Sequence, residues 1–326
     1  MEPRFLLMYC PQVFDKSFGS IKPEGSLGLI YLASALRDKK FDVHLLDAAV
    51  GGDEYTLNET FYNEVEQENG MIRIGMSIQS ILKEVKEYDV IGITSIFTAQ
   101  TRMVESVVDN IKKHYPEKLI ILGGVNARAQ KERFFNIGAD LICLSEAENT
   151  IIEIGNVLRA GKRDFSDISG LAGREGFINP QINVLQDLNE LPIPAWDMLP
   201  LKKYWEISRP HGGGFDDRKV AYASAMFSRG CPFKCDYCHI SKELSGDYSG
   251  NLRSLRVKSQ ERIMKEMKIL LELGVEYVFI EDDSLLAKKT RAIKIFNQLI
   301  EMNLELADVN GINLTHLCTK VDGKLG

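Results

Sequence analysis

The chain has 326 residues, of which 44% are apolar, so it is long enough for two domains with ordinary hydrophobic cores. Its formal net charge of −6 argues against a broad basic surface for DNA or RNA. No apolar run has the length of a membrane span, and the start of the chain lacks the long apolar stretch and positive flank of a secretory signal. Six cysteines without a paired framework fit a reducing cytoplasm, where we expect the protein to act without nucleic-acid or membrane partners.

Strand and helix signals alternate from residue 4 to residue 160. Short apolar runs predict strands at 4–10, 41–47, 89–96, 118–124 and 140–144. Helical patterns occur at 26–37, 101–114, 131–136 and 150–159. Ser26 is placed to cap the first helix, and the stretch before residue 88 is polar with only a weak helical pattern. This alternation predicts an α/β fold with a doubly wound parallel sheet, whose ligands bind at the carboxyl ends of the strands.

The alternation stops between Gly161 and Val220. Residues 171–173 and 181–184 predict a small hairpin, and residues 191–200 form a proline-rich, extended stretch. We interpret this region as a linker that packs on its neighbours.

From Val220 a second alternation begins. It predicts strands at 221–228, 276–282 and 306–312, and helices at 259–273 and 290–302. On the last helix we expect an inward face of Ile293, Phe296, Leu299 and Ile300. The predicted domains are a doubly wound α/β domain at 1–165, a linker with the hairpin at 166–220, and part of a (β/α) barrel at 221–326.

Cys231, Cys235 and Cys238 form the most specific pattern in the chain, CxxxCxxC. Soft thiolate ligands favour an iron–sulfur cluster or zinc. A 4Fe–4S cube has four irons, so three cysteines leave one iron open for a reaction. A structural zinc site that includes His239 is the alternative, but zinc sites usually use two separated ligand pairs, and His239 directly follows Cys238.

The remaining cysteines lie in scattered apolar segments, where a buried and inert thiol is the expected role. They are Cys10, Cys143 and Cys318.

With Tyr237 as the aromatic residue, the cysteine run resembles the cluster loop of the radical S-adenosylmethionine (SAM) enzymes, CxxxCx(aromatic)C. The resemblance implies that the three cysteines bind three irons, that SAM binds the fourth, and that Tyr237 lies against the adenine. It also implies SAM contacts at Glu281 and Asp282, for which a strand-ending turn with solvated acids is the alternative. Those enzymes use six βα units and about three are present here, so we expect a truncated barrel.

The segment that ends the third predicted strand is similar to cobalamin-binding domains. Those domains carry S-x-L, then 26 to 28 residues, then G-G; here the run that contains Ser95 is followed by 26 residues and then by Gly123 and Gly124. The resemblance implies that the nucleotide tail of cobalamin enters between neighbouring strands. Thr94, Ser95 and Thr98 would offer hydroxyls there. The two glycines would let the backbone approach closely.

A third motif of such domains, D-x-H-x-x-G, supplies a histidine to cobalt from the loop after the first strand. That loop, residues 11–25, contains no histidine. We therefore expect cobalamin to bind without a protein histidine on cobalt. A flavodoxin-like domain that binds no cobalamin is the alternative.

Together, these resemblances imply a cobalamin-dependent radical SAM enzyme. It would cleave SAM reductively to a 5′-deoxyadenosyl radical, using an electron donor of the flavodoxin or ferredoxin type, and transfer a methyl group to an unactivated carbon of a small-molecule substrate. Two alternatives stay open: cyclisation or rearrangement with the same cofactors, and a cobalamin- and iron–sulfur-binding fragment without turnover. From the short second alternation we expect that this chain is a fragment that cannot complete the reaction alone.

Overall fold

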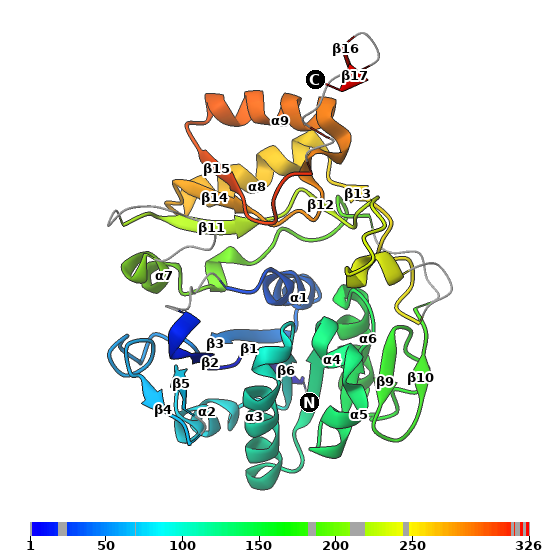
Figure 1. The fold of residues 1–326 in the computed structure, drawn as a ribbon. Helices are drawn as coiled ribbons and strands as arrows, with labels where there is room; N and C mark the ends of the chain where they lie inside the picture. Colours follow the sequence, from blue (N-terminus) through cyan, green and yellow to red (C-terminus); the bar gives the residue numbers. More distant parts are fainter. Residues whose placement is uncertain are drawn as a thin grey trace.

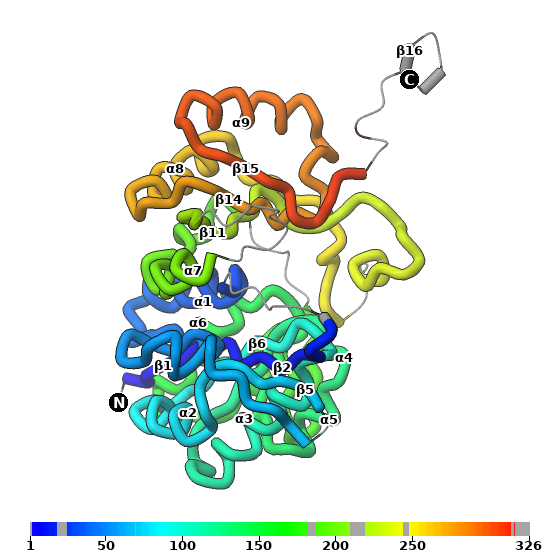
Figure 2. Tube along the Cα trace, turned by 60° about the vertical axis from the view of Figure 1, so that its left-hand side comes forward, coloured from blue at the N-terminus to red at the C-terminus, as the bar shows by residue number. Residues whose placement is uncertain are grey.

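The computed structural model describes residues 2–18, 25–68, 70–181, 187–208, 219–243, 248–313, 316, 320–321 and 324–325. These residues form two stacked units, a first unit around a seven-stranded sheet and a second unit around a three-stranded sheet (Figure 1). Helices α1 (Leu27–Asp38) and α7 (Leu201–Ile207) lie between the two sheets, as the turned view in Figure 2 also shows. No helix in the described part of the chain is long and apolar enough to cross a membrane.

The seven-stranded sheet has the order β10-β9-β8-β7-β6-β1-β3, and its strands from β8 to β3 are parallel. Its strands are β1 (Arg4–Tyr9), β3 (Asp42–Asp47), β6 (Val90–Thr94), β7 (Leu119–Gly123), β8 (Leu141–Cys143), β9 (Leu171–Gly173) and β10 (Ile178–Asn179). Alternate residues of β1 are buried on opposite faces, which explains why the strands read as continuous apolar runs. The predicted parallel α/β sheet is confirmed.

The predicted hairpin is present as β9 and β10, but it extends the main sheet as an antiparallel edge. Its second strand is Ile178–Asn179, so the prediction of 181–184 was misplaced; residues 182–184 lie outside the described residues. A strand of two residues is too short to show the alternation of apolar and polar side chains, so the sequence pattern alone cannot locate it.

Helices cover both faces of the main sheet (Figure 1). On one face lie α1 and α6 (Glu148–Arg159), and on the other lie α2 (Ile78–Val85), α3 (Thr101–His114) and α5 (Lys131–Asn136), while the short α4 (Val125–Ala129) follows β7. The polar stretch before residue 88 was only partly predicted. It contains β4 (Val65–Glu66) and β5 (Met71–Ile74), which pair with β2 (Gln12–Asp15) in a separate antiparallel sheet.

The second unit has three parallel strands, β11 (Tyr222–Ala225), β14 (Tyr277–Ile280) and β15 (Glu305–Asp308), with helices α8 (Gln260–Glu272) and α9 (Lys289–Glu301). On α9 the predicted inward face is only partly correct: Leu299 is buried and Phe296 packs against the core, but the other two predicted residues are not inward. Ala292, Ile295 and Leu299 are buried, whereas Ile293 and Ile300 are 47% and 75% exposed. Successive residues of a helix point about 100° apart, so a shift of one residue changes the face that is buried. The sequence of α9 has two adjacent apolar stripes, and pattern alone does not decide which of them faces the core.

The remaining elements are short. They are β12 (Ser228–Arg229), β13 (Arg256–Val257), β16 (Lys320–Val321), β17 (Lys324–Leu325), and the 3₁₀ turns Lys16–Phe18, Thr98–Gln100, Trp196–Met198, His239–Lys242 and Leu285–Lys288. Strands β12 and β13 pair antiparallel on either side of the cysteine loop.

The segment between the units is bonded to both of them. The indole N–H groups of Trp196 and Trp205 donate to backbone carbonyls of β11 at 2.9 and 2.7 Å. On the other side, the Tyr204 hydroxyl donates to Oδ2 of Asp47 at 2.6 Å, at the end of β3. One apolar core therefore runs from α1 and α6 through this segment into the second sheet.

Candidate cofactor sites

A cavity of about 280 Å³ opens where the parallel strands of the main sheet end. The first unit contributes most of its wall, including Ser26, Leu29, Thr94, Ile96, Gly123, Gly124, Glu146 and Glu148. The second unit contributes Met226 and Arg229, from the segment that leads into the cysteine loop. Since β6 ends at Thr94 and β7 at Gly123, the cavity lies at the carboxyl edge, where ligands of parallel sheets bind.

The two predicted glycines have different roles at this edge. A Cβ on Gly123 would meet no atom within 4 Å, so this residue borders open space. Gly124 has φ +99°, and a Cβ there would lie 2.5 Å from the carbonyl oxygen of Ser95. The fold itself therefore requires glycine at 124, whereas at 123 the absent side chain enlarges the cavity.

The three predicted hydroxyls are not brought together. Thr94 lines the cavity, but Ser95 is buried and its Oγ accepts a hydrogen bond from Nδ2 of Asn126 at 2.8 Å. Thr98 is exposed and lies in a separate groove beside Arg102. Consecutive residues at a strand end point to opposite faces, which the spacing of a motif does not reveal.

Sequence reasoning treated Ser26 only as a helix cap. The structure places it in the cavity wall, and its side chain makes no hydrogen bond to the first turn of α1. The capping signal located the residue correctly but could not show which way the hydroxyl points.

The three motif cysteines follow β12 in one loop and are half-buried. The N–H of Cys231 donates to the carbonyl of Arg253, and that of Cys238 donates to the carbonyl of Cys235, both at 3.1 Å. Within the described residues, no three histidine, cysteine or acidic side chains are arranged to hold one metal ion. The loop thus brings the three thiols into one segment without converging them on a common centre.

The entry to this loop is fixed by backbone geometry. Gly230 has φ +85°, and a Cβ there would lie 2.4 Å from the carbonyl oxygen of Ser254. The glycine lets the start of the cysteine loop pass closely over the segment that leads back into β13.

The acidic residues predicted for SAM differ in their surroundings. Asp282 is fully buried, and its carboxylate accepts the N–H of Phe227 at 2.6 Å and the hydroxyl of Ser228. Burial raises the pKa of Asp282, and these hydrogen bonds oppose the shift. Asp282 therefore holds the strand that enters the cysteine loop. Burial also raises the pKa of Glu281, at the end of β14, while Tyr237 is 93% exposed and open to a ligand.

Arg229, two residues before Cys231, joins the two units. Its Nη2 donates to Oε1 of Glu148 at 2.7 Å, its Nη1 lies 3.3 Å from Oε2 of Glu146, and its guanidinium carbon lies 4.5 Å from the ring centre of Tyr31. Burial alone would lower the pKa of Arg229, but the two carboxylates outweigh it and raise the pKa. The guanidinium is therefore neutralised by the first unit, not by solvent or by the cysteine loop.

A second ionic link follows the cysteines. Arg128, on α4, pairs with the buried carboxylate of Glu243, which also lies 3.2 Å from Nδ1 of His239. Burial and the nearby charge of Arg128 lower the pKa of His239. Nδ1 of His239 is thus directed to Glu243. Together, the two links hold the cysteine loop against the carboxyl edge of the main sheet.

Comparisons with known proteins agree with this arrangement. Residues 23–155 match the family described as B12 binding domain. An uncharacterized methyltransferase of Pyrococcus horikoshii is 27% identical over 86% of this chain and 53% of its own length. Cytidylyl-2-hydroxyethylphosphonate methyltransferase of Streptomyces wedmorensis is 26% identical over 88% of this chain and 56% of its own length. The chain therefore spans about half the length of these relatives.

A solved structure is also similar in fold. The radical S-adenosylmethionine methyltransferase TsrM from Kitasatospora setae, with cobalamin and a [4Fe-4S] cluster bound, superposes with a TM-score of 0.61 at 14% identity, over 94% of this chain and 56% of that one. The predicted resemblance to cobalamin-binding radical SAM enzymes is confirmed, and so is the fold of a doubly wound domain followed by a radical SAM unit.

Proposed function

We propose that this chain binds cobalamin, a 4Fe–4S cluster and SAM, and that it acts in methyl transfer to an unactivated carbon of a small molecule. One observation carries the proposal: the cavity at the carboxyl edge of the B12-type sheet is walled by Met226 and Arg229, which lead directly into the cysteine loop. A corrinoid in the cavity and a cluster in the loop would therefore face one another. The names of the relatives support the methyl-transfer step.

The described residues fit these cofactors. The cavity is mostly apolar, and the open space at Gly123 admits a flat ring system against the backbone. Cys231, Cys235 and Cys238 would supply thiolates for three irons, and the exposed Tyr237 and the half-buried Glu281 lie on the segments expected to meet SAM. When bound, cobalamin would supply the methyl group, and the cluster with SAM would supply the radical. The chain's own role is to orient these groups and to exclude water.

Cobalt is proposed to lack a protein histidine, because the loop after β1 has none in its sequence. His44 is exposed on β3, and Nδ1 of His114 lies 2.9 Å from the carbonyl of Asn110 at the far end of α3. Electron paramagnetic resonance of the cob(II)alamin complex should show no nitrogen splitting from a protein ligand. Splitting that disappears in His44→Ala would contradict this assignment.

The remaining parts of the proposal concern organisation. The domain boundaries are proposed at 165 and 220, and an electron donor of the flavodoxin or ferredoxin type is proposed to reduce the cluster. Methylation is favoured over cyclisation or rearrangement with the same cofactors, because both relatives quoted above carry methyltransferase names.

The test is anaerobic reconstitution followed by absorption spectroscopy and metal analysis. We expect corrinoid and iron–sulfur bands together, and slow release of 5′-deoxyadenosine from SAM with dithionite. Alanine at Cys231, Cys235 or Cys238 should abolish the iron–sulfur bands and leave the corrinoid bands. Cys10→Ala is the matched control, because Cys10 is buried in the core of the first unit and lines neither the carboxyl-edge cavity nor the cysteine loop. Stoichiometric zinc without iron would overturn the cluster assignment.

A further inference from the structure

A buried hydroxyl without a partner lies at the carboxyl-edge cavity. Ser26 is 7% exposed, and its Oγ has no hydrogen-bond partner among the described residues. Its backbone has the φ of −103° and ψ of 114° of a helix N-cap, yet its side chain makes no cap hydrogen bond. A buried hydroxyl that bonds neither protein nor solvent is costly, so its presence in a cavity wall points to a ligand.

The other polar side chains of this wall are already engaged. Glu146, Glu148 and Arg229 neutralise one another, and the Ser145 hydroxyl donates to the carbonyl of Ser249 at 2.7 Å. Thr94 is only half-buried, so the solvent can satisfy its hydroxyl. Ser26 is therefore the buried, unsatisfied polar group that this wall presents.

Ser95, the serine of the run similar to S-x-L, does not present an unsatisfied hydroxyl to the cavity. Ser95 does not line the cavity, and its Oγ is held by Asn126. Asn126 also donates to Oγ1 of Thr101 at 3.0 Å, so the Ser95 hydroxyl belongs to a buried network beneath the loop.

We infer that the Ser26 hydroxyl donates a hydrogen bond to the heterocyclic base of a cobalamin nucleotide tail in this cavity, in the place of Ser95. The inference rests on the proposed function. The base is flat and largely apolar, with one ring nitrogen that accepts a hydrogen bond when it is not on cobalt. An apolar cavity with a single buried hydroxyl donor is complementary to it.

The experiment compares cobalamin with cobinamide, which keeps the corrin ring and lacks the nucleotide tail. Dissociation constants are measured anaerobically by equilibrium dialysis for the wild type, Ser26→Ala, Ser26→Thr and Ser95→Ala. Ser26→Ala should weaken cobalamin binding roughly tenfold and leave cobinamide binding unchanged. Ser26→Thr keeps the hydroxyl and should retain most of the affinity, and Ser95→Ala should not discriminate between the two ligands.

Folding is followed separately by thermal unfolding of the ligand-free protein. Ser26→Ala removes an unsatisfied polar atom and should not lower the Tm. Ser34→Ala is the matched control, because Ser34 is buried on the same helix with its hydroxyl bonded to the carbonyl of Tyr31 at 2.8 Å. It should lower the Tm without a selective effect on cobalamin.

Two results would overturn the inference while the proposed function stands. One is equal loss of cobalamin and cobinamide binding in Ser26→Ala, or no loss of either. The other is a selective loss of cobalamin in Ser95→Ala alone. A wild-type protein that binds neither corrinoid would instead overturn the proposed function, and the inference with it.

Discussion

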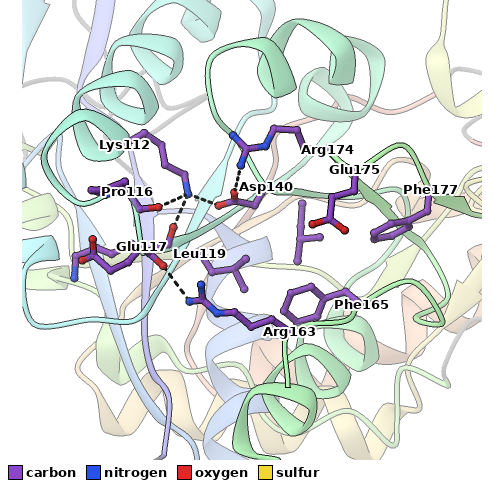
Figure 3. A pocket seen from close by; sticks show the side chains of 13 residues that line it. Lys112, Pro116, Glu117, Leu119, Asp140, Arg163, Phe165, Arg174, Glu175 and Phe177 are labelled. Atoms are coloured by element: carbon purple, nitrogen blue, oxygen red, sulfur yellow. Dashed lines mark hydrogen bonds and ion pairs between the residues drawn. The ribbon is translucent and has the colours of Figure 1, made fainter. Parts of the chain in front are cut away.

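The main sheet has a cavity at each end, and the two differ in what their polar groups do. The amino-edge cavity is about 240 Å³, close in size to the carboxyl-edge cavity of about 280 Å³. Figure 3 shows Lys112 and Arg174 pointing toward Asp140 at the amino edge. Nζ of Lys112 lies 2.6 Å from Oδ2 of Asp140, and Nη2 of Arg174 lies 3.1 Å from Oδ1.

At the amino edge the charged side chains bond to one another and to the backbone. Asp140 also accepts the N–H of Ile120 at 2.8 Å, and Nη2 of Arg163 donates to the carbonyl of Glu117 at 3.0 Å. These bonds tie together the segments in which β7 and β8 begin. At the carboxyl edge, by contrast, the wall is mostly apolar, its charged groups pair with one another, one buried hydroxyl is unsatisfied, and Gly123 borders open space. The two cavities are therefore distinguished by their unmet bonding capacity and not by their size.

Breaking the ionic link at the carboxyl edge should have the largest effect on stability. Arg229→Met leaves the buried carboxylate of Glu148 without its cation, and we expect a loss of about 3–5 kcal/mol in the free energy of unfolding. The matched change at the amino edge is Lys112→Met, which leaves Asp140 bonded to Arg174 and to the backbone. It should cost less than half as much in urea unfolding. Equal losses would contradict the difference drawn between the edges.

Larger side chains introduced into the two cavities should affect cobalamin binding and thermal stability differently. Gly123→Leu should weaken cobalamin binding about 100-fold, equivalent to about 2.7 kcal/mol, because the side chain enters the space proposed for the tail. The Tm should change little, since a Cβ at this position meets no atom within 4 Å. Glu175→Leu at the amino-edge cavity is the control and should leave cobalamin binding unchanged. A large loss of Tm in Gly123→Leu would show that the space is structural.

Gly124 is a poor site for the same test. Its positive φ and its close approach to the Ser95 carbonyl mean that Gly124→Val would strain the backbone wherever the ligand binds. Reduced cobalamin binding in that variant would report on folding as much as on the cavity.

The pH dependence of stability should show the buried carboxyl at the end of β3. Burial raises the pKa of Asp47 to about 6, opposed by the Tyr204 hydroxyl and the N–H of Ala49. Because the folded state favours the protonated acid, this contribution is present below about pH 4 and is lost as the pH rises through about 6, with a size of about 3 kcal/mol. Asp47→Asn should flatten the unfolding free energy across this window. An unchanged slope would place the titration elsewhere.

The strands and motifs, which depend on periodicity and spacing, could be predicted from the sequence. The direction in which individual side chains point could not. Continuous apolar runs predicted the parallel strands, because both faces of the sheet are buried. The cysteine spacing and the serine-to-glycine spacing predicted the resemblance to cobalamin-binding radical SAM enzymes. However, the same motif could not show that Ser95 turns to Asn126 while Ser26 faces the cavity, because both hydroxyls lie at chain turns whose geometry is tertiary.

The second unit shows the same limit. The apolar positions of α9 were recognised, but two adjacent stripes were compatible with the sequence, and only packing against the second sheet selects Ala292, Ile295 and Leu299. In the small antiparallel sheet, β4 has two residues and β2 and β5 have four each, which is at or below the shortest length at which alternation is detectable.

The smallest effect on the free energy of unfolding is expected for Arg174→Ala, at the exposed side of the amino-edge cavity. This variant tests whether the ion pairs of that cavity have only a structural role. The side chain of Arg174 is 50% exposed, and ion pairs of this kind contribute about 0.5 kcal/mol. Asp140 keeps Lys112 and the Ile120 N–H, so the single variant should change the unfolding free energy by roughly that amount and leave cobalamin binding unchanged. Combined with Lys112→Met, the loss should exceed the sum of the single losses, since the carboxylate then retains the backbone donor alone. An additive double variant would show that the two cations act independently, and a loss of corrinoid affinity in Arg174→Ala would show that the two edges are coupled through the sheet.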